Sequence, residues 1–154
     1  MVAILTGSNY QVAGRVWLDA GRDFALRVIL DTGSCVSLVR KALIPLEMKV
    51  ASLDAATAQL FDVNGGLLSI TGTVTLTVRV GSYSTPVTCG VVRGMSVPLL
   101  LGTDYTDFHV PKICGPKGYI RLQNGCRVPI LRRGKTLSYA RAWSWGICRP
   151  TPVR

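Results

Sequence analysis

One short motif in the sequence could do chemistry. Asp31, Thr32, Gly33 and Ser34 follow directly on the apolar residues 28–30. A continuous apolar run of this kind favours a buried strand, which would leave the Asp at the corner where the strand gives way to a loop. Thr32 can form hydrogen bonds and Gly33 can turn tightly, so the pattern predicts a carboxylate held at that corner. An ordinary Asp-Thr-Gly turn is the structural alternative.

The surrounding chain favours an all-β barrel or sandwich. Short apolar and β-branched runs alternate with Gly, Pro, Asn and Asp, and long helical patterns are missing. Residues 12–18 and 24–30 predict a hairpin that leads into Asp31. Asn64 and Gly65 predict a tight turn between two further strands, at residues 57–63 and 67–71.

A second group of strands is expected toward the C-terminus. Residues 73–80 alternate apolar and polar side chains, as a strand with one buried face does. A short helical turn is expected after Gly102, capped by Thr103 or Asp104. The other strands are expected at residues 87–92 and 97–101, and in a last hairpin at residues 118–122 and 126–131.

Positive charge is concentrated in the C-terminal third of the chain. It has 154 residues, and 18 Lys and Arg against 8 Asp and Glu give a formal net charge of +10. Residues 1–107 hold eight bases and all eight acids, whereas residues 108–154 hold ten bases and no acid. Because the strand pattern also dissolves near Arg132, we expect a domain at residues 1–131 and a basic tail or linker at 132–154. Such a tail is either a solvated segment or a surface for nucleic acid or another acidic partner.

Several classes of protein are excluded or disfavoured. The apolar fraction of 48% excludes a disordered chain, and no aliphatic run reaches the roughly 18 residues of a membrane span. No secretory signal is recognisable, so a cytoplasmic protein without membrane contact is expected. The five cysteines are widely spaced and His109 is the sole histidine, which favours neither a metal site nor a Ser/His or Cys/His hydrolase. We therefore expect no metal and no cofactor.

Three segments together resemble the retropepsin-like aspartic proteases, and among these most closely the proteases of gypsy-type LTR retrotransposons. They come in the family's order and the likeness spans roughly residues 12–131. The segments are residues 24–39 around Asp31-Thr32-Gly33, then Val63-Asn64-Gly65-Gly66 with Ile70-Thr71-Gly72, and residues 98–105 with Leu99-Leu100-Leu101-Gly102. The resemblance implies a closed β-barrel of the acid-protease fold with one short helix, active as a symmetric homodimer.

The resemblance also implies roles for the residues of the motif. Asp31 would be the catalytic carboxylate, and Thr32 would brace the loop by hydrogen bonds across the dimer. Gly33 would let the substrate approach closely, and Ser34 would hydrogen-bond the outer oxygen of Asp31.

Two further elements take their roles from the same resemblance. Leu100, Leu101 and Gly102 would form a second apolar element that packs beneath the catalytic loop. The tip of a flap that folds over the bound peptide would be Asp62, Val63, Asn64, Gly65 and Gly66.

Aspartic-protease chemistry requires two carboxylates on one water, one ionised and one protonated. The chain holds a single Asp-Thr-Gly, so the second carboxylate is expected from another copy across a two-fold axis. Asp104, which follows Gly102 and Thr103, is the one internal substitute, and we expect it instead to cap the helical turn.

The sequence thus predicts an aspartic endopeptidase that processes a retroelement polyprotein and itself, located in the cytoplasm and within virus-like particles. A weak RNA contact through the basic tail is a further expectation. Two alternatives stay open. One is a cellular protease of the same superfamily, either a domesticated retroelement or the DNA-damage-inducible type. The other is a basic β-barrel that binds nucleic acid without catalysis.

Overall fold

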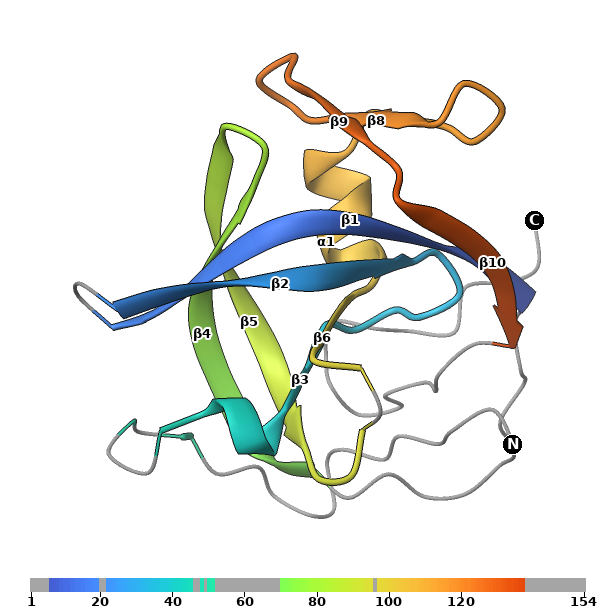
Figure 1. Ribbon diagram of the computed structural model, residues 1–154. Coiled ribbons are helices and arrows are strands. Elements are labelled where there is room, and N and C mark those ends of the chain that lie inside the picture. Colours follow the sequence, from blue (N-terminus) through green and yellow to red (C-terminus); the bar gives the residue numbers. More distant parts are fainter. Residues whose placement is uncertain are drawn as a thin grey trace.

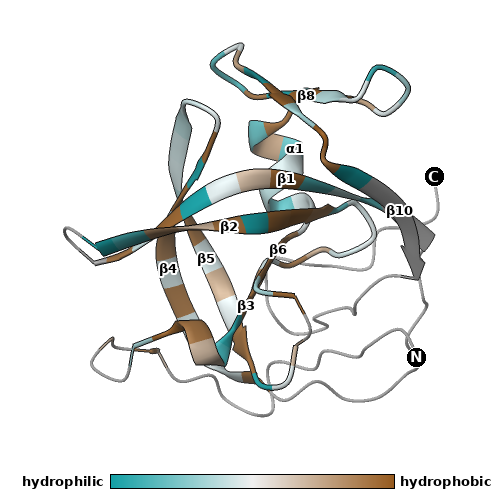
Figure 2. Cartoon of the chain, in the orientation of Figure 1, coloured by the Kyte–Doolittle hydropathy of each residue, from teal (hydrophilic) through white to brown (hydrophobic). Residues whose placement is uncertain are grey.

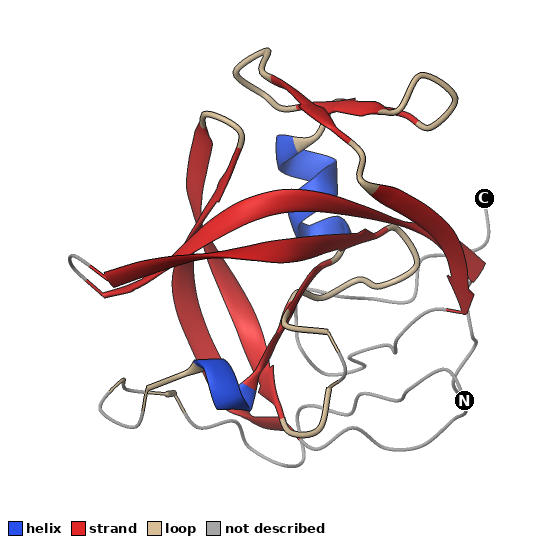
Figure 3. Ribbon diagram, in the orientation of Figure 1, coloured by secondary structure: helices blue, strands red, loops and turns tan. Residues whose placement is uncertain are grey.

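The computed structural model describes residues 6–19, 22–45, 48, 50–51, 70–95 and 97–137 (Figure 1). Within these ranges strands predominate, and the helices are short (Figure 3). In chain order the elements are β1 (Thr6–Asp19), β2 (Arg22–Asp31), β3 (Leu38–Arg40), the 3-10 helix η1 (Lys41–Leu43), β4 (Ile70–Val80), β5 (Tyr83–Val92), β6 (Leu99–Leu101), α1 (Thr103–His109), β7 (Lys112–Cys114), β8 (Tyr119–Arg121), β9 (Arg127–Pro129) and β10 (Arg132–Leu137). In this part of the chain no helix is long and apolar enough to cross a membrane.

Six strands close into a barrel. The order in the larger sheet is β10-β1-β2-β6-β3-β5-β4, and β4 also pairs with β1, which completes a ring of β1, β2, β6, β3, β5 and β4. The ring closes because β1 is fourteen residues long and pairs with β2 over much of its length and with β4 at Gly14–Trp17. The expected all-β class, with a closed barrel and a short helix after Gly102, is confirmed.

The barrel interior is filled by side chains from alternate positions of its strands. In β4, Val74, Leu76, Val78 and Val80 are buried, whereas the intervening residues from Thr75 to Arg79 are exposed. Figure 2 shows brown hydrophobic residues alternating with paler residues along the β4–β5 hairpin. Each fully buried aliphatic side chain contributes about 1.5–3 kcal/mol relative to leaving it in water, so the alternation fixes which face of the hairpin is inside.

A separate three-stranded sheet of β7, β8 and β9 follows the helix. Its β8–β9 hairpin is the one expected from residues 118–131. Ile120 and Val128 lie opposite each other in this hairpin, and both are buried in the main core. One face of the small sheet therefore packs on the barrel, and the other face is left outside.

Strand pairing continues past Leu131, where a tail was expected to begin. Arg132–Leu137 form β10, which pairs antiparallel with β1 from Gln11 back to Thr6. The segment holds only one large apolar residue in six, so its sequence gives little strand signal. Backbone hydrogen bonds to the edge of β1 decide its conformation instead. Residues 138–154 lie outside the described part of the chain, as do the expected flap tip, Asp62 to Gly66, and most of the hairpin predicted around it.

The β1–β10 ladder predicts a difference between two truncated chains. A chain that ends at Leu137 should be more stable to urea than one that ends at Leu131, by about 1–3 kcal/mol, because the shorter chain loses the net contribution of the ladder hydrogen bonds. Both lack residues 138–154, so the difference in unfolding free energy reports on β10 alone. Equal unfolding midpoints would show that β10 adds nothing to the fold.

Candidate active site

Asp31 is the last residue of β2 and is fully buried. The strand carries it into the protein, since residues 28–31 are all buried while most of the earlier part of β2 is exposed or half-buried. The backbone N–H of Gly33 donates to Asp31 Oδ1 at 2.9 Å, and the N–H of Ser34 donates to the Asp31 carbonyl at 3.2 Å. The loop that follows β2 therefore curls back on the carboxylate and holds its orientation.

The other residues of the motif are divided between the surface and the interior. Thr32 is exposed, whereas Gly33 and Ser34 are buried. The resemblance implied that Ser34 hydrogen-bonds Asp31. In the structure the Ser34 hydroxyl donates to the carbonyl of Val36 at 2.8 Å, so it braces the loop's own backbone. The sequence does not distinguish these two acceptors, because both lie within three residues of the hydroxyl.

β6 holds both ends of the Asp31 loop. It runs parallel to β2, with Leu101 opposite Leu30, and antiparallel to β3, with Leu100 opposite Leu38. The strand that enters the loop and the strand that leaves it are therefore both paired to β6. All three leucines of β6 are at most 1% exposed, which explains the continuous apolar run in this part of the sequence.

Gly102, directly after β6, contacts the backbone of the Asp31 loop. A methyl group on its Cα would lie 2.5 Å from the Ser34 carbonyl oxygen and 2.7 Å from that of Val36. Its φ of −92° is open to any residue, so lack of space, not backbone conformation, requires glycine here. The next residue adds a direct bond, since the Thr103 N–H donates to the Ser34 carbonyl at 2.7 Å.

Asp104 braces the same loop from helix α1. It accepts hydrogen bonds from the Ser37 N–H at 3.0 Å and the Ser37 hydroxyl at 2.7 Å. The Ser37 oxygen in turn accepts from the Gly102 N–H at 3.2 Å. The expectation that Thr103 or Asp104 is the helix cap is wrong, because Gly102 occupies the N-cap position and makes no side-chain cap bond. The Asp104 carboxylate instead accepts hydrogen bonds from Ser37 in the Asp31 loop.

Burial raises the pKa of Asp104 above its ordinary value of 3.8, and the bonds from Ser37 act in the opposite direction. Sequence reasoning did not find Ser37, because its partner is 67 residues away and no local pattern links the two.

His109 lies at the end of α1 and packs among aromatic rings. Its Nδ1 is 2.6 Å from the Tyr83 hydroxyl oxygen, and its ring is 4.9 Å from that of Tyr105. Burial lowers the pKa of His109, although the charge of Asp104 acts in the opposite direction. These contacts explain the histidine as a packing residue between the helix and β5. Among the described residues no group of three or more His, Cys, Asp or Glu is placed to hold a metal ion.

The likeness of this chain to known proteins lies in its fold and not in its sequence. No protein-family model and no curated protein matches the chain in sequence. Solved structures do match it. One is the retroviral protease-like domain of Ddi1 from Leishmania major, with a TM-score of 0.54 and 16% identity over 80% of this chain and 95% of that one. The chain has the retropepsin-like fold. The six-stranded barrel, with its Asp-containing loop held by β6, is therefore a retropepsin-like barrel with one Asp-Thr-Gly.

The close contact at Gly102 predicts the effect of adding one methyl group. Gly102→Ala should cost about 2–3 kcal/mol of unfolding free energy, because the obstructing atoms are backbone carbonyls that cannot rotate away. Gly94→Ala is the control. A methyl group there meets nothing within 4 Å, and only its φ of +69° is strained, at about 1 kcal/mol. Urea denaturation measures both, and a Gly102 variant as stable as the wild type would contradict the packing argument.

The Ser37 bonds predict a pH-dependent loss of stability. Ser37→Ala leaves the Gly102 N–H without its partner and removes a donor from Asp104, at about 1–3 kcal/mol. With a raised pKa, folded Asp104 holds its proton at pH values where the unfolded chain has released it, so its burial costs stability as pH rises. Loss of the Ser37 hydroxyl raises the pKa of Asp104 further, so the loss of stability in Ser37→Ala should be larger at pH 7 than at pH 4.

The matched control for Ser37→Ala is Ser84→Ala, which removes an exposed hydroxyl from β5. It should change unfolding free energy by less than about 0.5 kcal/mol. Thermal unfolding of both variants at the two pH values tests the assignment. A Ser37 deficit that is the same at both values would show that Asp104 is not coupled to this hydroxyl.

Proposed function

We propose that the chain is an aspartic endopeptidase, active as a symmetric homodimer in which each copy supplies Asp31. The observation that carries the proposal is the placement of Asp31. In a retropepsin-like barrel it is a buried carboxylate at the end of β2, oriented by the Gly33 N–H and held in a loop fixed by β6. The exposed Thr32 beside it puts this corner of the barrel next to the surface. A second copy can therefore reach it.

One carboxylate cannot perform the reaction alone. Two carboxyl groups about 3 Å apart share one proton, because both cannot be ionised at that distance. The ionised member takes a proton from water as the water oxygen attacks the peptide carbonyl carbon. The protonated member hydrogen-bonds the carbonyl oxygen and then helps to protonate the amine nitrogen as the C–N bond breaks. No covalent intermediate with the enzyme forms, and neither metal nor cofactor takes part.

The substrate we propose is an extended peptide, which can pair with backbone groups as an added strand. We further propose that Asp62 to Gly66 cover it, and that the natural substrates are a retroelement polyprotein and the chain itself, within virus-like particles. These assignments rest on the likeness to gypsy-type proteases in the Asp31, flap and Leu100-Leu101-Gly102 segments.

A second candidate keeps the chemistry and changes the setting. A matching solved structure is a protease-like domain of Ddi1, which favours a cellular protease of that type as the alternative. Processing of the chain's own flanking sequences distinguishes the two, because self-release is expected of a polyprotein protease only.

The test of catalysis is Asp31→Asn in the full chain. Cleavage of a mixed peptide library, read by mass spectrometry, should fall by about 10²- to 10⁴-fold or more, because the amide cannot accept the proton of the attacking water. Pepstatin should inhibit the wild type. Asp23→Asn is the control: Asp23 lies on the same strand but on the surface, in an ion pair with Arg15, and its loss should leave cleavage unchanged. If the Asp31 variant still cuts at the wild-type rate, Asp31 is not the catalytic carboxylate.

A further inference from the structure

Three basic residues face one another across the small sheet. Lys112 in β7 lies directly opposite Arg121 in β8, and Arg121 lies directly opposite Arg127 in β9. Residues directly opposite in a sheet project from the same face, so the three form one row across the strands. Like charges in this arrangement destabilise a sheet unless an opposite charge lies nearby.

The row lies on the outer face of the sheet. The neighbouring cross-strand row consists of Ile113, Ile120 and Val128, and the last two are buried against the barrel. Because side chains alternate between faces along a strand, the basic row points away from the barrel. Lys112 and Arg127 are exposed and Arg121 is half-buried.

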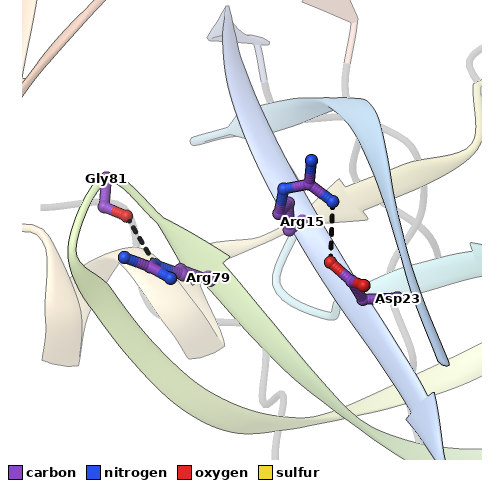
Figure 4. A network of polar contacts seen from close by, with 4 residues as sticks. All are labelled: Arg15, Asp23, Arg79 and Gly81. Atoms are coloured by element: carbon purple, nitrogen blue, oxygen red, sulfur yellow. Dashed lines mark hydrogen bonds and ion pairs between the residues drawn. The ribbon is translucent and has the colours of Figure 1, made fainter. Parts of the chain in front are cut away.

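Among the described residues, no carboxylate forms an ion pair with any of these three side chains. An ion pair elsewhere in this part of the chain joins Arg15 and Asp23 at 2.7 Å (Figure 4). Arg15 also lies directly opposite a second cation, Arg79, where β1 pairs with β4. There Asp23 neutralises one guanidinium, and Arg79 donates to the Gly81 carbonyl at 3.0 Å. No described carboxylate pairs with the row on the small sheet in this way, and residues 108–154 contain no acid.

An aromatic ring lies beside the row on the same face of the sheet, since Tyr119 is two residues before Arg121 in β8. The Arg127 guanidinium carbon is 4.6 Å from the centre of the Tyr119 ring, and the Lys112 ammonium is 5.7 Å from it. A hydrogen bond from Lys112, together with the two positive charges, lowers the pKa of the Tyr119 hydroxyl. The ring restrains both cationic side chains on the surface, which reduces the entropy they lose when they bind a ligand.

We propose that this outer face of β7–β8–β9, which we call the basic row (Lys112, Arg121, Arg127 with Tyr119), binds single-stranded nucleic acid through its phosphates. Neighbouring β-strands are about 4.8 Å apart, so the row spans about 10 Å. This length is enough to contact consecutive phosphates of one nucleic-acid strand. Basic side chains combined with an aromatic ring on an open surface are typical of such sites. This binding is independent of the proposed peptidase activity.

The direction of the row favours nucleic acid over an acidic peptide. A peptide that adds to a sheet runs parallel to the strands, along one edge. The basic row crosses the strands, so a peptide docked in that way would contact one or two of the three cations. A flexible polyanion that lies across the face can contact all three. The proposal also moves the expected RNA contact from residues 132–154 to the described sheet.

The test measures binding of a fluorescein-labelled 20-nucleotide oligouridylate to the full chain by anisotropy, between 50 and 300 mM salt. In the triple variant Lys112→Gln/Arg121→Gln/Arg127→Gln we expect affinity at low salt to fall at least tenfold. The slope of log affinity against log salt should fall in magnitude by about 2, because each phosphate contact on a single strand contributes about 0.7. The matched control, Arg27→Gln/Lys41→Gln/Arg93→Gln, removes the same charge at positions outside the small sheet and should bind as the wild type does.

Further binding measurements test the alternatives to this result. If the triple variant does not fold, the single variant Arg121→Gln should still reduce the slope by about 0.7. An oligodeoxyuridylate of the same length should bind through the same three residues, since phosphates are the shared ligand. The proposal is overturned if the wild type binds neither oligonucleotide, or if both triple variants weaken binding equally. It is also overturned if a 20-residue polyglutamate competes for the basic row more strongly than RNA.

Discussion

The backbone of the Asp31 loop lies so close to Gly102 that no side chain fits between them, and the placement of the carboxylate depends on this contact. β6 brings Gly102 there because it pairs with the strand that enters the loop and with the strand that leaves it. Ser37 and Asp104 then tie the far end of the loop to α1. A carboxylate at the end of an isolated strand would be mobile. With its loop held by β6, Gly102 and the Ser37–Asp104 bonds, Asp31 is already oriented in the single chain, as the proposed reaction requires.

This construction supplies one carboxylate where the proposed reaction needs two. Within the described residues Asp104 is not a substitute, because Ser37 donates hydrogen bonds to both of its carboxylate oxygens. A two-fold axis beside Asp31 is the simplest way to bring two identical loops together, and it gives both carboxylates the same surroundings.

The excess positive charge of the chain lies away from this site in the sequence. Residues 1–107 are neutral on balance, and the excess of basic residues lies in the sequence after residue 107. The proposed nucleic-acid surface and the proposed active site are therefore built from different elements.

The parts of the fold that follow from local pattern could be predicted from the sequence. The apolar run before Asp31 and the alternation at residues 73–80 identify β2 and β4, and the three leucines identify β6. Pairs distant in sequence could not be predicted. No local sequence pattern links Ser37 with Asp104, which are 67 residues apart. The conformation of β10 is determined by pairing with the edge of β1 and not by its own residues. Asp104 after Gly102 resembles a helix cap locally, and only the approach of Ser37 gives it another role.

The central claim is that two copies of Asp31 form one active site, and mixing tests it most directly. Wild-type chain and the Asp31→Asn variant are unfolded together, refolded at equal amounts, and assayed at constant total concentration. Random pairing leaves about a quarter of the dimers with two Asp31 carboxylates, so activity should fall to about a quarter of that of the wild type alone. Activity of one half, in proportion to the wild-type chain present, would show that a single chain suffices and would contradict the account.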